Sequence, residues 1–336
     1  MDFFGFSLWH DLITGDKKWT DSLELGDPRE FDIEEDGWKL VFSRLQQVLH
    51  DSGLKNGLGA CFHTSSRIPG IISDPAFDIY EPFKLARDDF KKRIPFEFGM
   101  HSTFGLQDLP LSGYYPGVLA EDIRLATKLG ATCIVGHPPK DKKVCIRPFV
   151  DELTSNQVVD TLKSTSITLN WENMGPNNFF GSLKSLLEFH DALSDKLREI
   201  GYEGLIKQHQ FCLDTGHLLL WRHQVKLGLK KAQKEIEQYL PDFAKNLKSY
   251  HIHSNDGTSD NHIIPGSLEF FDHPSRKGIN KKRFLKHSED VMDFLKTCDE
   301  YKGIEGRHVH LEALKLPFSL NQVIEFGRKY KELIKL

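Results

Sequence analysis

GVLAEDIRLATKLGATCIVGHPP, residues 117–139, contains one complete unit of the expected fold. Its first part carries apolar residues at helical spacing and ends at Gly130, a typical helix C-cap. The apolar run at 132–137 then predicts a buried strand that ends on His137. The stretch therefore predicts a helix, a buried strand and a chemically active side chain at the carboxyl end of that strand.

The same unit recurs along the chain. Apolar, β-rich runs predict eight strands near residues 3–9, 58–63, 96–102, 132–137, 167–172, 210–214, 249–254 and 308–313. Helical patterns separate them, among them 37–52, 80–92 and a long helix from about 224 to 247. Eight alternations favour a closed (β/α)8 TIM barrel over an open doubly wound sheet, and neither GxGxxG nor GxxxxGK[ST] is present to indicate a nucleotide site.

Length and composition agree with one large domain. The 336 residues suit a single TIM-barrel domain over 1–336, and 39% hydrophobic residues suffice for a sizeable core. The segment 16–35, rich in charge with Gly26 and Pro28, predicts an extended loop inserted after the first strand. The domain is therefore expected to be one barrel with a single long insertion.

The chain shows no sign of export or of a membrane partner. It has no apolar run near the roughly 20 residues that span a bilayer and no signal-peptide pattern at its beginning, so we expect a cytoplasmic protein. Its five cysteines are widely spaced without a CxxC, which indicates neither a disulfide framework nor a thiolate zinc site.

A net charge of −4 provides no overall attraction for nucleic acid. Two basic segments near predicted strand ends are exceptions: Lys140 to Lys143 with Arg147, and Ser275 to Arg283. They are interpreted either as contacts that follow a phosphate backbone or as ordinary solvated loops.

Ligand-type side chains stand at the carboxyl ends of six predicted strands or in the loops that follow, where barrel enzymes carry their chemistry. A lone histidine is more often a hydrogen-bonded interior group, and a carboxylate such as Asp214 can simply cap the next helix. Neither explanation suits so many carboxylates converging on one mouth, because they would repel one another without a cation. The candidate metal ligands are His101, His137, Glu172, Asp214, His217, His253, Asp260, His262 and Glu312.

Four further histidines are less informative. His251 lies two residues before His253, and His308 and His310 share a strand face with Glu312, so these three are expected deeper in the barrel in supporting or structural roles. His63 is notable only for its position at the end of the second strand.

Over strands three to eight the chain resembles the endonuclease IV-like (AP endonuclease family 2) branch of the xylose-isomerase-like TIM barrels. The matching motifs are His101, the His-Pro at 137–138, the Glu-Asn at 172–173, the Cys-x-Asp-Thr-x-His at 212–217, the His-x-Asn-Asp at 253–256, the Asp-x-His at 260–262 with Gly266, and Glu312. All nine metal positions of that branch are filled.

The resemblance implies up to three zinc ions, with manganese or iron as substitutes. By it, His101 and His137 hold the first ion, and Glu172 bridges it to a second held by Asp214, His253 and Glu312. The third ion would take His217, Asp260 and His262. The implied reaction is phosphodiester cleavage at abasic or damaged DNA sites, in which a metal-bound hydroxide attacks phosphorus in line.

Members of that branch wedge DNA apart with residues near the third strand, and the present sequence differs from them there. Phe104 and Gly105 stand where the branch has a Tyr-Leu pair, and Arg67 in the loop after the second strand could substitute for the arginine that the branch inserts. Two other activities stay open: isomerisation or epimerisation of a small sugar or sugar phosphate, with Glu172 and Glu312 as the catalytic pair, and oxidation by a multinuclear iron site. A barrel that only binds, without metal, explains the ligand-type residues least well.

Overall fold

The computed structural model describes residues 2–9, 36–55, 57–63, 80–102, 106–108, 111, 114–140, 146–268, 278–301, 306–312 and 320–334. Eight parallel strands close into a barrel in chain order, with β1 paired to both β2 and β8. This confirms the predicted (β/α)8 barrel. The strands are β1 (Phe3–Trp9), β2 (Gly57–His63), β3 (Phe96–His101), β4 (Cys133–Gly136), β5 (Thr168–Glu172), β6 (His209–Asp214), β7 (Leu247–Ile252) and β8 (His308–Leu311).

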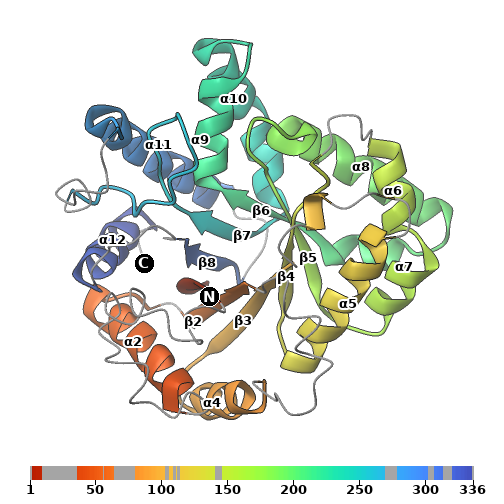
Figure 1. Cartoon of the computed structure of the whole chain (residues 1–336), viewed down its shortest axis with the longest axis horizontal. Helices are drawn as coiled ribbons and strands as arrows, with labels where there is room; N and C mark the ends of the chain where they lie inside the picture. Colours follow the sequence, from red (N-terminus) through yellow and green to blue (C-terminus); the bar gives the residue numbers. More distant parts are fainter. Residues whose placement is uncertain are drawn as a thin grey trace.

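Helices form a ring around the strands (Figure 1). They are α2 (Asp36–Ser52), α4 (Tyr80–Arg93), α5 (Tyr114–Leu129), α6 (Ile146–Leu153), α7 (Asn156–Lys163), α8 (Leu183–Glu199), α9 (Thr215–Gln224), α10 (Leu229–Lys245), α11 (Lys281–Glu300) and α12 (Leu320–Ile334). Short 3-10 turns occupy Leu106–Asp108, Phe179–Gly181 and Glu203–Gln208. No helix in the described part of the chain combines the length and hydropathy that a bilayer crossing requires.

One helix was not predicted. The helix expected from about 224 to 247 is present as α10, but the chain also forms α9 directly after β6, which the sequence did not predict. Seven of the ten residues of α9 are buried, so it lacks the polar face that makes helical periodicity visible in a sequence. The predicted insertion at 16–35 lies outside the described residues. Arg67, Phe104 and Gly105, which belong to other loops, also lie outside them.

The alternation of β5 shows how the strands divide core from site. Trp171 points outward, fully buried, and packs edge-on against Phe149 of α6 and Phe189 of α8. Because successive strand residues face opposite sides, its neighbours Asn170 and Glu172 point into the barrel. The apolar core thus lies between the strands and the helices, and it holds the inner face rigidly.

The barrel interior is unusually polar. In such barrels alternate strands contribute layers of four side chains, commonly branched and apolar. The strand registers here place Cys61, Val135, Cys212 and His310 in one layer. His101, Glu172 and His251 belong to the layer above it, and His137, Asp214 and Glu312 follow at the mouth. The interior therefore carries ligand-type groups for at least three layers.

Candidate metal centre

All nine predicted ligands meet at the carboxyl end of the barrel in one continuous cluster. Each has a ligand atom within 4 Å of at least one other member. The cluster consists of five imidazoles and four carboxylates, and most of its members are buried. Sequence reasoning thus identified residues that the fold assembles; their role as ligands remains a prediction.

The first group is built on β3, β4 and β5. Nε2 of His101 lies 3.4 Å from Oε2 of Glu172, and Nε2 of His137 lies 3.0 Å from the same oxygen. The two imidazole rings meet edge to face with centroids 4.4 Å apart. Three donors around one point match the predicted first ion position.

The second group joins β6, β7 and β8. Nε2 of His253 lies 3.0 Å from Oδ1 of Asp214, and neither side chain is exposed. His262 stacks on His253 with centroids 4.0 Å apart, and its Nε2 lies 3.7 Å from Oε2 of Glu312. His262 therefore belongs with Asp214, His253 and Glu312 as well as with the third group to which the sequence assigned it.

The third group lies at the outer rim. Asp260 is the centre: its Oδ2 lies 3.4 Å from Nε2 of His217, and its Oδ1 lies 3.2 Å from Nδ1 of His262. The other ring nitrogen of His217 lies 3.2 Å from Oε1 of Glu172. Asp260, with 38% of its side chain exposed, marks the side from which solvent reaches the cluster.

The start of α9 fixes several of these groups at once. Asp214 is the N-cap of α9, and its Oδ1 accepts a hydrogen bond from the backbone N–H of His217 at 2.7 Å. Asn173 donates to the backbone carbonyl of Asp214 and accepts from its N–H, which ties β5 to β6. A Cβ on Gly216 would overlap the ring of His253, so a glycine is required here. The capping role that the sequence left open is therefore present together with the cluster contacts.

His262 is held in a strained conformation. Its φ is +45°, the only positive value for a non-glycine among the described residues. Two backbone hydrogen bonds between Ser254 and Ile263, of 2.8 and 3.0 Å, hold the loop against β7 directly beside it. Strain of this kind persists where the surroundings impose it, and it is common at functional sites.

Charges in the cluster are strongly coupled. Burial raises the pKa of Glu172, but its interactions with the neighbouring histidines His137, His251 and His101 outweigh burial and hold that pKa well below its usual value. Burial likewise lowers the pKa of His217, but Asp214 and Asp260 raise it well above normal. Without a cation, therefore, a protonated His217 balances the carboxylates that surround it.

Two other histidines of the cluster have lowered pKa values, so their rings are neutral at neutral pH. Burial, followed by the charge of His253, lowers the pKa of His262 to about 4. Burial and His101 also lower the pKa of His137. Neutral imidazoles keep a lone pair for a metal, so these two rings are in the form that coordination requires.

The sequence placed His251 in a deeper, supporting position, and the structure gives it specific contacts. The side chain is fully buried, with Nδ1 3.3 Å from Oε2 of Glu312 and 3.6 Å from Oε2 of Glu172. His308 lies at the other end of the barrel, where its Nε2 is 3.0 Å from Oε2 of Glu97. Only the registers across several strands reveal these partners, because they are far apart in the chain.

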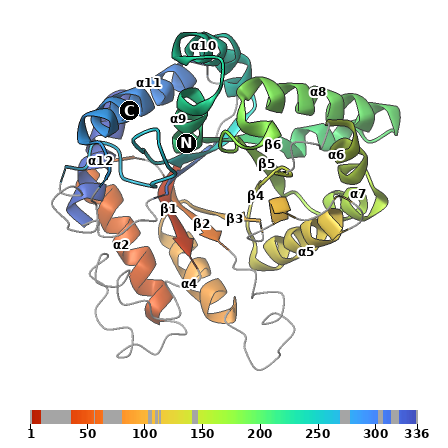
Figure 2. The same cartoon turned by 45° about the horizontal axis from the view of Figure 1, so that its top comes forward.

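A basic groove lies outside the barrel, between α9, α10 and α11, which are neighbours in both views (Figure 1, Figure 2). Its volume is about 860 Å³. The N–H of Asn280 donates to Oδ2 of Asp256, which links one wall to the loop that carries Asp260. The acidic lining residues are Glu237, Asp290 and Asp293; the basic ones are Arg222, Lys230, Lys234, Lys282, Arg283 and Lys286.

Residues 118–295 match the family described as the xylose isomerase-like TIM barrel. No curated protein sequence matches the chain. A D-tagatose 3-epimerase-like protein is similar in structure, with a TM-score of 0.53, 15% identity, and 99% of this chain and 97% of that chain covered.

Two further solved structures resemble the fold. A Thermus thermophilus protein, solved after soaking with ZnCl2, has a TM-score of 0.50 and 15% identity, with 99% of each chain covered. A xylose isomerase-like TIM barrel protein from Mycobacterium smegmatis in complex with magnesium has a TM-score of 0.50 and 12% identity, with 88% of this chain and 89% of that chain covered. At such identities the likeness concerns the fold.

Proposed function

This chain belongs to the xylose isomerase-like TIM barrel family, and from that premise we propose that it is a metal-dependent phosphodiesterase acting on abasic or damaged DNA. Members of the superfamily include endonuclease IV, epimerases and isomerases. The substrate class proposed here therefore has to be argued from the site of this chain.

The observation that carries the proposal is the continuity of the nine-residue cluster. Five imidazoles and four carboxylates from six strands and the loops that follow them contact one another at one mouth, too many for a single octahedral ion. In multinuclear sites that hydrolyse phosphodiesters, the cations stabilise the negative charge on both the attacking and the leaving oxygen. The donor set thus suits a multinuclear hydrolytic site.

The donor chemistry fits zinc, with manganese and iron as alternatives, since imidazole and carboxylate ligands accept all three. Bound cations would supply a hydroxide at neutral pH and neutralise the leaving oxygen. His101, His137 and Glu172 would hold one cation, and Asp214, His253 and Glu312 a second. Two related folds were solved with zinc chloride or magnesium, which supports a divalent cation in this one.

The basic groove supports an extended anionic substrate. Six basic side chains line it against three acidic ones, and it borders the loop of Asp260. Lysine and arginine contacts position a nucleic acid through its phosphates without reading sequence. Of the two basic segments expected from the sequence, the second contributes Lys282 and Arg283 to this groove.

The decisive experiment is cleavage of a labelled duplex with one abasic site by protein purified without chelator. We expect the wild type to cleave the duplex and to contain more than one cation per chain. We expect Glu172→Gln to lose both the cleavage activity and the bound cations. Glu97→Gln is the matched control, because Glu97 lies at the opposite end of the barrel and binds His308.

The outcomes separate the activities. Cleavage by wild type and by Glu97→Gln, but not by Glu172→Gln, supports the proposal. Several bound cations without cleavage reject DNA hydrolysis and leave small sugars, phosphates or oxidation chemistry as the activities to test. Absence of bound cations rejects the metal centre itself.

Isomerisation or epimerisation is the second candidate, and one contact favours it. Glu172 and Glu312 both lie within 3.6 Å of Nδ1 of His251, so two carboxylates converge on one buried ring nitrogen below the mouth. Such a pair can exchange a proton on a substrate carbon. Incorporation of deuterium from solvent into sugars or sugar phosphates, lost in Glu312→Gln, would establish this activity instead.

A further inference from the structure

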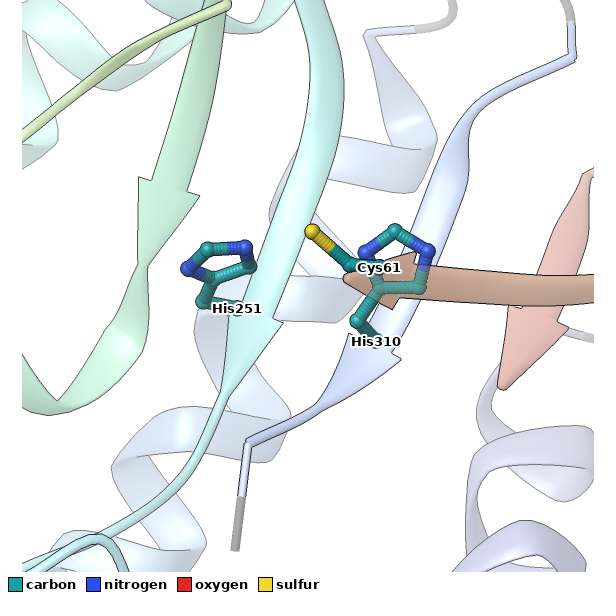
Figure 3. A group of neighbouring side chains, drawn as sticks. All are labelled: Cys61, His251 and His310. Atoms are coloured by element: carbon teal, nitrogen blue, oxygen red, sulfur yellow. The ribbon is translucent and has the colours of Figure 1, made fainter. Parts of the chain in front are cut away.

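A second group of ligand-type side chains lies at the lower edge of the mouth cluster, where His251 shares the layer of His101 and Glu172, and Cys61 and His310 occupy the layer below. Cys61 comes from β2, His251 from β7 and His310 from β8, and none of the three side chains is exposed. Figure 3 shows Sγ of Cys61 directed toward a ring nitrogen of His251, with the ring of His310 on the other side of Cys61. Three strands that are remote in sequence thus direct a thiol and two imidazoles to one point.

The distances suit a single ion. The ligand atoms of Cys61, His251 and His310 all lie within 4.8 Å of one another. His251 and His310 are register partners on neighbouring strands. Gly5 of β1 stands beside His310 in the register, and a Cβ there would overlap the backbone of Gly59, so β1 approaches β2 closely at this level. A cation at the centre of this triangle would need its ligands to contract only slightly to reach normal zinc bond lengths of about 2.0 to 2.3 Å.

The chemistry of this group differs from that of the mouth. The nine residues of the mouth cluster offer only nitrogen and oxygen, whereas Cys61 offers sulfur, which selects zinc-class and softer cations. Cys212 packs with Cys61 and Val135 in the same layer, but its ligand atom groups with those of Glu172 and His251, so Cys61 is the sulfur donor of this site. Cysteine and histidine together are the usual ligands of zinc in proteins.

We propose that Cys61, His251 and His310 form a buried thiolate site for a zinc-class cation, separate from the cations of the mouth. On binding, the Cys61 thiol releases its proton to solvent, and sulfur and two imidazole nitrogens form bonds to the metal. The bound cation would fill the centre of the barrel below the mouth. Through Nδ1 of His251 it would also orient Glu172 and Glu312, which lie 3.6 and 3.3 Å away.

Cobalt substitution tests this proposal in the full chain. After chelation and reconstitution with Co²⁺, a thiolate ligand gives a near-ultraviolet charge-transfer band that nitrogen and oxygen ligands do not produce. We expect the wild type to show the band. Cys61→Ser should lose the band and bind one cation fewer per chain, whereas Cys133→Ser should keep the band. Cys133 is the matched control because it is also buried in a barrel strand.

X-ray absorption of the zinc-loaded wild type gives a second measurement that needs no variant. Sulfur scattering at about 2.3 Å is expected. Absence of both the band and sulfur scattering overturns the proposal, as does a band that persists in Cys61→Ser. Neither measurement depends on DNA cleavage, so this site and the proposed activity fail or succeed independently.

Discussion

Glu172 is the residue on which the mouth cluster depends. Its two oxygens contact His101, His137 and His217, so it joins the first and third groups. Replacement by glutamine keeps the shape but removes the charge that cations require. We expect Glu172→Gln to weaken metal binding by at least about a hundredfold. Metal content and isothermal titration measure this, and unchanged metal affinity would contradict it.

His217 makes metal binding depend on pH. Its pKa is raised well above normal, so at neutral pH it carries a proton that a metal must displace. We therefore expect the apparent affinity for zinc to increase with pH up to the pKa of His217. Titrations in buffers of different ionisation enthalpy count the protons released, and His217→Gln should release fewer. Equal proton release in both proteins would refute this role.

At the scale of the element, α9 and the metal site share Asp214. The carboxylate caps the helix and also contacts His253. Asparagine can accept the same capping bond but lacks the charge, whereas alanine lacks both. We expect both variants to lose metal, and Asp214→Ala alone to lose about 1 kcal/mol more stability in the metal-free state. Urea unfolding of the two apo-proteins measures the difference, which should be absent if the cap is unimportant.

The opposite end of the barrel carries an ion pair between β3 and β8. Burial lowers the pKa of His308, but Cys133 and Glu97 outweigh it and raise that pKa to about 9. Because the folded pKa is the higher one, the pair stabilises fully below pH 6.5, and this contribution is lost as the pH rises through about 9.

Glu97→Gln tests that pair. The variant should be less stable than wild type by about 1 kcal/mol at pH 6, and the difference should vanish near pH 10. Thermal unfolding across this range gives the comparison. A difference independent of pH would mean that packing, and not charge, connects the two strands.

At the scale of the whole molecule, charge is distributed unevenly. The chain has a net charge of −4, yet six basic side chains gather in the groove between α9, α10 and α11. We expect binding of a polyanion to depend on this groove. Lys282→Ala should weaken DNA binding for all sequences alike and reduce the slope of log affinity against log salt by about 1. Lys163→Ala, on α7, is the control; an equal effect in both would exclude the groove.

Sequence by itself determined the strand pattern and the mouth. A (β/α)8 unit repeats locally, and ligand-type residues at strand ends must converge if the barrel closes, so the nine residues were identifiable without coordinates. Helix α9 was missed because burial on nearly all sides removes its periodicity. The strained φ of His262 was not predictable either, because the bridge between Ser254 and Ile263 imposes it from outside.

Only the tertiary structure decided which side chains share a layer. Cys61, His251 and His310 carry no spacing motif, since each comes from a different strand and the shear of the closed barrel sets their heights relative to one another. The groove likewise exists only because α9, α10 and α11 pack side by side. Local patterns fix what each strand presents, and closure of the barrel fixes which of those groups meet.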